Sequence, residues 1–387
     1  MGPTAGGGGG SLRGRRVVFV LTWSSFGGAE RKALTLARHL RDAEGAEPVC
    51  VALTAEAGAA AAVADELGIP WHVVPADWRG GRGDKARQLA RVARRLRSLR
   101  PDVLLPQCTF ASTVCGLTWR ATGARLCVWN QCDVIGSRVG TGLVRRALAS
   151  SSLAVACAHH GRELLVRELG AAPERTHTVY GEVRLPRPVE DRAAWRSRLG
   201  LGDADLAVTM LANFKPGKDH PTLLRAWRRV VDGRPEGAPR AVLVLAGSDL
   251  GTLRDAKAVA FDLDLGGTVR FPGRVADVAG LLAATDVAAL ASESECLGRG
   301  VLEPMAVGLP VTGTDNPGIR EAVGPDGAGL LAPPGDAGAL AGRLLRLLDD
   351  GDLRGRAGAA NASRIAAAFS RERTTDAYVR LLEDALA

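Results

Sequence analysis

Residues 291–321 read ASESECLGRGVLEPMAVGLPVTGTDNPGIRE, and this stretch predicts how the second half of the chain folds. It follows an apolar, β-like run at 287–290, passes through a polar turn and enters a helix-like segment at about Gly298. Glu295 lies in the turn, and Glu303 lies inside the helix. A helix start whose backbone N–H groups are left uncovered by glycine binds anions readily. The stretch therefore predicts a cradle for a diphosphate with a carboxylate on each side, placed to bind sugar hydroxyls.

The spacing of residues from Glu295 to Val311 resembles the E-x7-E signature of retaining glycosyltransferases with the GT-B fold, specifically glycosyltransferase family 4. The positions in step with the family pattern E-x-F-G-x4-E-A-M-A-x-G-x-P-V are Glu295, Gly298, Glu303, Met305, Ala306, Gly308, Pro310 and Val311. The chain departs from the pattern at Leu297, where the family has an aromatic residue, and at Pro304, where it has alanine. The alternative is a packed helix between two buried strands, with its glutamates on the surface.

The size and composition of the chain limit its class. A chain of 387 residues suits two domains, and it holds no run of eighteen apolar residues that would predict a membrane span. Residues 1–14 are rich in glycine and lack the apolar core of a signal peptide, so we expect a disordered tail. A net charge of +8 with 4% aromatic residues is modest for a nucleic-acid-binding protein, so no nucleic-acid partner is expected.

The seven cysteines form no C-x-x-C pair, are odd in number and lie mostly in apolar stretches. They indicate buried thiols in a reducing, cytoplasmic location rather than a disulfide or zinc framework. Lysine is rare in this chain, which has five lysines among its 50 basic residues. A lysine therefore marks a position where arginine would not serve equally well.

Short apolar runs alternate with amphipathic ones in both halves, which predicts parallel sheets covered by helices on both faces. Strands are expected at 16–23, 48–53, 72–75, 103–106, 125–130, 153–158 and 176–179, and again at 206–212, 241–246, 269–272, 287–290 and 311–314. The fold class is α/β, and the resemblance implies two doubly wound Rossmann-like domains that face each other across a cleft. The expected domains are an acceptor-binding domain at 15–184, a nucleotide-sugar-binding domain at 185–369, and a helix at 370–387 that returns to the first domain.

The segment NFKPGKDH at 213–220 follows an expected strand and precedes a helix. Two of the five lysines, Lys215 and Lys218, lie in it, and cations beside a helix start can neutralise a diphosphate leaving group. By resemblance, Lys218 matches a lysine of the family, Asn213 stands where the family has arginine, and Lys215 supplies that charge. The alternative is a solvated loop with incidental lysines.

Two other loops resemble donor-binding loops of the same family. Gly27 and Gly28 open a G-G-A-E-R segment whose glycines would approach the donor sugar and phosphates, and the alternative is a plain β-to-α turn. Arg274 follows an expected strand, and the resemblance places the nucleotide base against backbone groups there. Leu297, Gly298 and Arg299 complete the implied donor-binding set around the helix start.

The catalytic position of the first domain departs from the family. Many members carry a histidine after the strand that matches 125–130, whereas this chain reads WNQCD at 129–133. Asp133 there could serve as a base or an acceptor ligand, or it could cap the next helix. Both interpretations remain open on the sequence.

Two features suggest binding chemistry but have simpler explanations. The D-x-D pairs at 203–205 and 262–264 look like metal–nucleotide motifs, but we interpret them as solvated acids and expect no metal or other cofactor. The arginine-rich segment 85–100 has a core-facing apolar stripe, and its other face could touch an anionic membrane. A merely solvated face is the favoured interpretation.

The resemblance implies an enzyme that moves a sugar from a nucleotide-sugar donor, a UDP-hexose or UDP-N-acetylhexosamine, to an acceptor hydroxyl with retention of anomeric configuration. Lys218, Glu295 and Asp133 are the implied catalytic residues, and Glu303 would hold the ribose of the nucleotide. The alternatives are an inactive glycosyltransferase-like partner protein and another GT-B enzyme, such as a sugar-nucleotide epimerase.

Overall fold

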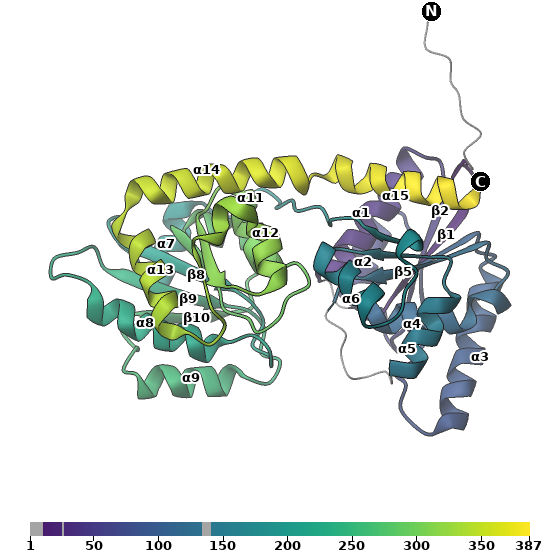
Figure 1. The fold of residues 1–387 in the computed structure, drawn as a ribbon, viewed down its shortest axis with the longest axis horizontal. Coiled ribbons are helices and arrows are strands. Elements are labelled where there is room, and N and C mark those ends of the chain that lie inside the picture. Colours follow the sequence, from purple (N-terminus) through teal and green to yellow (C-terminus); the bar gives the residue numbers. More distant parts are fainter. Residues whose placement is uncertain (1–10, 25–26, 134–140) are drawn as a thin grey trace, which may run out of the picture. The chain divides into compact units, whose positions relative to one another are not determined.

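A computed structural model describes residues 11–24, 27–133 and 141–387 (Figure 1). The chain divides into two compact units. The first comprises the described residues up to Glu182 together with Arg371–Ala387, and the second is Val183–Ser370. Each unit is built on its own parallel sheet with helices on both faces, as the alternation of apolar and amphipathic segments predicts.

The first unit has a seven-stranded parallel sheet in the order β3-β2-β1-β4-β5-β6-β7. Its strands are β1 (Arg16–Leu21), β2 (Glu47–Ala52), β3 (Trp71–Val73), β4 (Val103–Pro106), β5 (Leu126–Gln131), β6 (Leu153–Ala156) and β7 (Thr176–Thr178). Its helices are α1 (Gly28–Asp42), α2 (Gly58–Glu66), α3 (Arg82–Ser98), α4 (Cys108–Thr118), α5 (Thr141–Ser150), α6 (His159–Arg167) and α15 (Arg371–Leu386), with 3-10 turns at Trp119–Ala121 and Pro173–Arg175.

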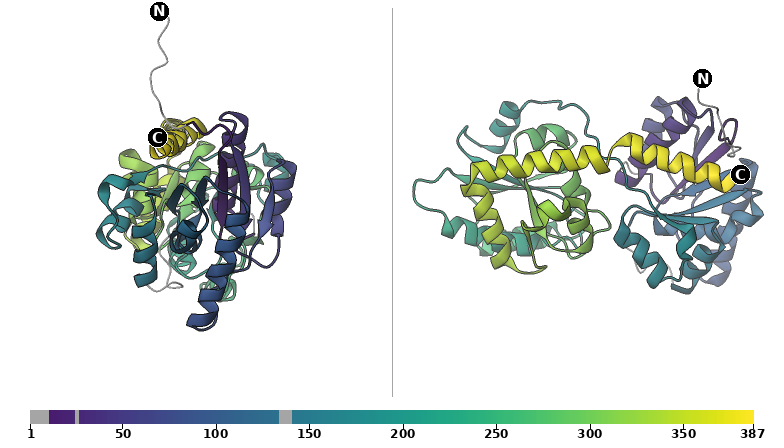
Figure 2. Two further views of the ribbon diagram at one scale, coloured as in Figure 1. Left: turned by 90° about the vertical axis from the view of Figure 1, so that its right-hand side faces the viewer. Right: turned by 45° about the horizontal axis from the view of Figure 1, so that its top comes forward.

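Strand β1 shows how the two faces of this sheet are built. Phe19 and its alternate neighbours pack into one hydrophobic cluster, while Val18 and Val20 pack into another on the opposite face. The first cluster also receives Tyr378 and Leu382 from the C-terminal helix α15, which contacts α1 (Figure 2). The chain end therefore completes the core of the first unit, and the predicted return of the last helix is confirmed.

The second unit has a six-stranded parallel sheet in the order β10-β9-β8-β11-β12-β13. Its strands are β8 (Leu206–Leu211), β9 (Ala241–Ala246), β10 (Val269–Gly273), β11 (Val287–Leu290), β12 (Val311–Thr314) and β13 (Leu331–Ala332). Its helices are α7 (Arg192–Leu199), α8 (His220–Gly233), α9 (Leu253–Asp262), α10 (Val278–Ala283), α11 (Arg299–Ala306), α12 (Pro317–Ala328), α13 (Ala337–Asp349) and α14 (Gly351–Ala368).

The strand order reverses once in each sheet. In the first unit the reversal lies between β1 and β4, and in the second it lies between β8 and β11. At such a point the loops that leave the carboxyl ends of the two strands turn to opposite faces, which opens a crevice where ligands of this architecture bind. The predicted lysine loop follows β8 and the predicted glutamate turn follows β11, so both lie at the reversal of the second sheet.

The prediction of a Gly-rich tail over residues 1–14 needs a correction. Residues 1–10 lie outside the described residues. Leu12, however, is only 1% exposed and packs into the core of the first unit, and the N–H of Gly14 donates to the carbonyl of Gly45 at 2.9 Å. Residues 11–14 therefore belong to the folded unit, because one apolar side chain reaches the core.

No helix in the described part of the chain is both long enough and apolar enough to cross a bilayer. The cysteines are all free thiols in the structure: five are buried, and Cys108 and Cys132 are half-buried. On α3, the apolar stripe of the arginine-rich segment is buried at Val92 and Leu96, as its spacing predicts.

Candidate active site

The loops after β8 and β11 are joined by backbone contacts. Lys218 and Ser292 form a short antiparallel bridge, and the N–H of Glu293 donates to the carbonyl of Gly217 at 2.9 Å. The Ser292 hydroxyl donates to the same carbonyl at 3.0 Å. Two segments that are far apart in sequence are thereby fixed in register at the reversal of the sheet.

This register brings two of the predicted catalytic side chains together. The ammonium of Lys218 donates to the carboxylate of Glu295 in an ion pair, and the two side chains are only 16% and 14% exposed. A charge held this far from water costs free energy unless an opposite charge or a ligand accompanies it. The pair is thus a preformed cation and anion, each able to exchange its partner for a ligand group of the right charge or hydrogen-bonding capacity.

Glycines allow the helix start to lie close to this pair. Gly298 precedes α11 in the left-handed region, with φ at +48°, and it offers no side chain to cap the helix. A Cβ on Gly300 would lie 2.4 Å from the carbonyl oxygen of Leu211, and a Cβ on Gly318 would lie 2.2 Å from that of Glu295. The start of α11 therefore packs against the end of β8, with its first backbone N–H groups left without a side-chain cap.

The second predicted carboxylate lies one turn along α11. Glu303 accepts from the guanidinium of Arg299 at 2.8 Å, an i,i+4 pair along α11 in which the Glu303 side chain is 18% exposed. Like Glu295, this carboxylate is held by one cation and can exchange it for a ligand hydroxyl.

Three other predicted donor-site residues of the second unit, Asn213, Lys215 and Arg274, lie on the loops that follow β8 and β10. The side-chain oxygen of Asn213 accepts from the N–H of Ser248 at 3.0 Å, which ties the loop to the end of β9. Lys215 lies at the exposed start of the turn that ends at Lys218, and it has no ion pair within the described part of the chain. Arg274 is exposed after β10, at the same sheet edge but two strands from β8.

Residues outside the predicted catalytic and donor-binding set also support this site. The hydroxyl of Thr314 and the side-chain amide of Asn316 donate to the carbonyl of Ser292 at 2.6 and 2.9 Å, so they hold the glutamate turn from below. Beside the lysine, His220 stacks on Phe214 with ring centroids 4.2 Å apart. The contacts of Thr314 and Asn316 span 22 and 24 positions of sequence, so local patterns gave no signal for them.

His220 also contacts the lysine loop through its ring. Its Nδ1 lies 3.2 Å from the carbonyl oxygen of Lys218. Burial lowers the pKa of His220 to about 4, because the interior disfavours the imidazolium. The ring is therefore neutral near physiological pH and adds no charge beside Lys218.

In the first unit, the predicted glycines start α1. The N–H of Gly27 donates to the carboxylate of Glu30 at 3.0 Å, and Gly28 is the first residue of the helix. Burial raises the pKa of Glu30. The Gly27 amide thus has an internal partner, which any bound anion would have to displace.

Asp133 accepts three hydrogen bonds at the carboxyl end of β5. The donors are the N–H and the hydroxyl of Thr109, at 3.0 and 2.8 Å, and the side-chain amide of Gln131 at 3.1 Å. Asp133 therefore caps the start of α4. That it caps the helix following it in sequence stays a prediction, because residues 134–140 lie outside the described residues. Burial raises the pKa of Asp133 to about 6, which suits a group that exchanges a proton near neutral pH.

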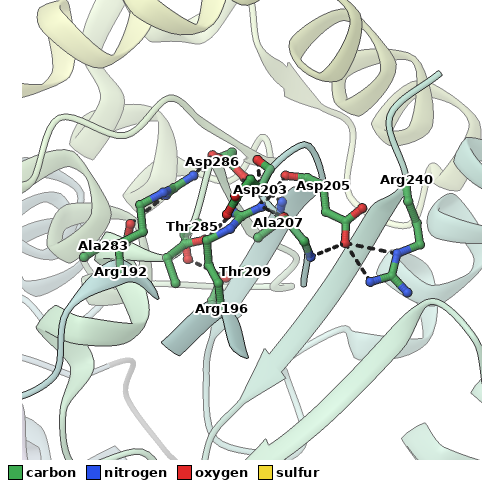
Figure 3. Close-up of polar contacts among 12 residues, drawn as sticks. Arg192, Arg196, Asp203, Asp205, Ala207, Thr209, Arg240, Ala283, Thr285 and Asp286 are labelled. Carbon is green, nitrogen blue, oxygen red and sulfur yellow. Dashed lines mark hydrogen bonds and ion pairs between the residues drawn. The ribbon is translucent and has the colours of Figure 1, made fainter. Parts of the chain in front are cut away.

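The D-x-D pair at 203–205 is only partly solvated (Figure 3). Asp203 is exposed as expected, but Asp205 forms an ion pair with Arg240 at 2.6 Å. Buried Arg196 donates to the backbone carbonyl of Asp205 at 2.7 Å and to Asp286 at 3.4 Å. These acids pair with arginines at the end of the sheet opposite the lysine loop. Among the described residues, no group of three His, Cys, Asp or Glu side chains is arranged to hold a metal ion.

A hollow in the second unit does not coincide with this chemistry. It is lined by the segment after Glu182 and by α10, and it reaches Val307 and Ile365. None of the predicted site residues lines it. The candidate site at the sheet reversal is therefore identified by its charged and glycine residues.

Two family models match the chain over consecutive ranges. Residues 26–185 match Glycosyltransferase Family 4, and residues 191–364 match Glycosyl transferases group 1. The chain belongs to the family of glycosyltransferases that these two models describe. The second match contains the lysine loop, the glutamate turn and α11, so the site lies in the part of the chain that defines group 1.

Curated relatives of the family match over part of their length. The chain is 33% identical to the D-inositol 3-phosphate glycosyltransferase of Streptomyces scabiei over 207 residues, which are 51% of this chain and 46% of that protein. It is 30% identical to a GDP-mannose-dependent monoacylated alpha-(1-6)-phosphatidylinositol monomannoside mannosyltransferase of Corynebacterium glutamicum, over 51% of this chain and 52% of that protein. The chain thus spans about half the length of these relatives.

The fold is that of solved GT-B glycosyltransferases. The crystal structure of Anabaena HepE in complex with UDP and glucose superimposes with a TM-score of 0.82 at 21% identity, over 95% of this chain and 99% of that one. The prediction of a GT-B architecture with two Rossmann-like domains is confirmed.

Proposed function

We propose that the protein transfers a glycosyl group from a nucleotide-diphosphate sugar to an acceptor hydroxyl, with its donor site at the sheet reversal of the second unit. The observation that carries the proposal is the meeting of Lys218 and Glu295 beside the uncapped start of α11. A cation, a carboxylate and free backbone N–H groups are the chemical partners of a sugar diphosphate.

The leaving group of such a donor gains negative charge as the glycosidic bond breaks. Lys218 and the N–H groups of Arg299 and Gly300 would stabilise this charge on the diphosphate, and Lys215 would add a second cation from the same turn. Preorganised donors of this kind act on the transition state more than on the ground state.

The ion pair between Lys218 and Glu295 would couple binding of the diphosphate to binding of the donor sugar. When Lys218 turns to the diphosphate, Glu295 loses its cation and gains the capacity to accept from hydroxyls of the donor sugar. Glu303 would hold the ribose hydroxyls from the same helix, and Arg274 would mark the loop that receives the base. A nucleoside diphosphate without its sugar would satisfy the lysine but leave the carboxylate unpaired.

The first unit would supply the acceptor side. Asp133, whose pKa burial raises to about 6, is our candidate for the group that accepts or holds the acceptor hydroxyl. Gly27 and Gly28 would allow close approach of the donor.

The finer assignment is a UDP-hexose or UDP-N-acetylhexosamine donor, retention at the anomeric carbon, no resident metal, and action in the cytoplasm. Its support is the family membership and the UDP complex of HepE, a protein of the same fold. The name of the Corynebacterium relative includes GDP-mannose, so both bases belong in the test.

The test is a thermal-shift titration of the full chain with UDP, GDP and ADP in the presence of a chelator, followed by donor hydrolysis assays with the matching sugar nucleotides. We expect one nucleoside diphosphate to stabilise the protein and Glu303→Ala to weaken that effect. Lys257→Ala, in α9, is the matched control outside the site. Absence of any stabilisation by all three nucleotides would refute the donor site, and NMR of the product's anomeric proton would decide retention.

A further inference from the structure

Three cysteines that are distant in sequence follow the neighbouring strands β4, β5 and β6 of the first unit, whose labels β5, α4 and α6 mark the region in Figure 1. Cys108 is the first residue of α4 after β4, while Cys132 follows β5 and Cys157 follows β6. These strands are adjacent and parallel, so their carboxyl ends meet at one edge of the sheet. Hydrogen bonding with the thiols of Cys108 and Cys157 is the main cause that lowers the pKa of Cys132. The proposed glycosyl transfer uses none of these thiols.

A lysine is fixed beside the central sulfur. The Nζ of Lys32 lies 3.9 Å from the sulfur of Cys132 and donates to the hydroxyl of Tyr378 at 2.8 Å. That hydroxyl donates in turn to the side-chain oxygen of buried Asn130 at 2.7 Å. This chain of hydrogen bonds runs from β5 through α15 to α1 and holds the ammonium of Lys32 beside Cys132.

The backbone of Cys108 is adapted to the same contact. Cys108 has a φ of +68°, in the left-handed region that a residue with a side chain rarely adopts. The backbone N–H of Cys108, at the start of α4, also lowers the pKa of Cys132. A helix start and a lysine are the two surroundings that most favour a thiolate over a thiol.

The surroundings shift the pKa values of Cys132 and Cys108 in opposite directions. Hydrogen bonds from the Cys108 and Cys157 thiols, and then the charge of Lys32, hold the pKa of Cys132 well below its usual value, although burial opposes them. The hydrogen bond to Cys132, then burial and the nearby carboxyls of Asp133 and Glu30, raise the pKa of Cys108. Cys132 is therefore the more acidic of the two thiols.

We propose that Cys132 is a reactive thiolate, and that oxidation by a peroxide joins it to Cys108 in an intramolecular disulfide. Cys108 and Cys132 are both half-buried residues, whereas Cys157 is buried. Cys157 is the more enclosed of the two neighbours and contributes its hydrogen bond rather than the second sulfur.

The chemistry balances with hydrogen peroxide as the oxidant. The thiolate of Cys132 attacks one peroxide oxygen, so an S–O bond forms, the O–O bond breaks and the departing hydroxide takes a proton to become water. The Cys108 sulfur then gives up its proton and attacks the sulfenic sulfur, so an S–S bond forms and a second water leaves. Two thiols are oxidised and one peroxide is reduced to two waters.

The test treats the reduced full chain with hydrogen peroxide, blocks the remaining thiols under denaturing conditions and counts them by intact mass. We expect the number of free thiols to fall from seven to five, and peptide mapping to find one cross-link, between Cys108 and Cys132. Cys50→Ser removes a thiol on β2 whose pKa burial raises to about 12, and this control should form the same cross-link. A cross-link between any other pair, or none, would overturn the proposal.

A second variant separates the two steps. In Cys108→Ser, peroxide should leave a sulfenic acid at Cys132, which dimedone traps and mass spectrometry locates. Dimedone labelling spread evenly over the remaining cysteines would show that Cys132 has no special reactivity.

The wild-type chain also gives a readout that needs no substitution. Alkylation of Cys132 by iodoacetamide should keep its rate as the pH falls through neutrality, whereas an ordinary thiol slows by about tenfold per pH unit below its pKa of about 8.5. A rate for Cys132 that falls in parallel with that of free cysteine would contradict the thiolate.

Discussion

Replacing Lys218 by methionine separates the electrostatic role of this residue from its structural one. The backbone bridge to Ser292 does not depend on the side chain, so the loop register should survive. The substitution instead leaves the Glu295 carboxylate, only 14% exposed, without its cation. Removing one partner costs about 3–5 kcal/mol when a pair is fully buried and about 0–1 kcal/mol when it is exposed. For this pair we expect a loss of about 2–3 kcal/mol in the free energy of unfolding.

Turnover should respond differently from stability. If Lys218 stabilises the departing diphosphate, its loss should lower kcat by about 10²–10³-fold, the usual effect of one preorganised donor. A second change, Glu295→Gln, removes the unpaired charge and should restore most of the lost stability while turnover stays low. Double-mutant cycles in urea unfolding and in donor hydrolysis measure the two effects. Lys215→Met, from the exposed end of the same turn, is the control for stability and should change it by less than about 0.5 kcal/mol.

Two outcomes would refute this reasoning. Strictly additive unfolding free energies in the cycle would mean that the ion pair is not formed in solution. Unchanged kcat in Lys218→Met, with the fold intact, would mean that the lysine does not act on the leaving group.

Three further results are expected. Gly318→Ala should destabilise the protein by about 1–3 kcal/mol in urea unfolding, because its Cβ would meet the Glu295 carbonyl. Gly342→Ala, which has open space in α13, is the control and should not destabilise it. Equal effects of the two substitutions would exclude the close packing at Gly318. The pH profile of kcat/KM should fall on the acid side near the Asp133 pKa of about 6, and Asp133→Asn should abolish this limb together with most activity; a limb that persists would belong to another group. His220 is neutral in the folded state down to about pH 4 and charges earlier when unfolded, so stability should drop by about 3 kcal/mol as pH falls from 6.5 towards 4. His220→Phe should flatten this slope in thermal unfolding, and an unchanged slope would contradict the assignment.

Strand positions were predictable where one local pattern decided them. The runs Ala241–Ala246 and Val287–Leu290 are apolar throughout and buried on both faces, so their observed bounds agree with those expected. The edge strand β13 was missed because it has only two residues, Leu331–Ala332. Helix α14 was missed as well, since its glycines weaken the amphipathic pattern, although Gly358 is needed where α14 packs on the carbonyl of Gly308.

The site residues also include some that a local pattern predicts and others that only the packed fold brings together. The register around Gly298 and Glu303 is local, so the sequence located the helix start and the carboxylate on it. The cap that Asp133 places on α4 depends on β4 and β5 lying side by side, which no single stretch encodes. The stack of His220 on Phe214 escaped notice for a different reason: its burial appears only after α8 has packed against the sheet.

The helix α15 ties the order of synthesis to the order of folding. Tyr378, Leu382 and Leu386 fill the core of the first unit, and each buried side chain of this kind contributes about 2 kcal/mol. A ribosome makes the whole of Val183–Ser370 before these residues emerge, so the second unit is free to fold while the first still lacks part of its interior. Nascent chains should therefore expose an unfilled apolar surface on the first unit until Arg371–Leu386 has been synthesised, which makes that unit the one that needs chaperone protection.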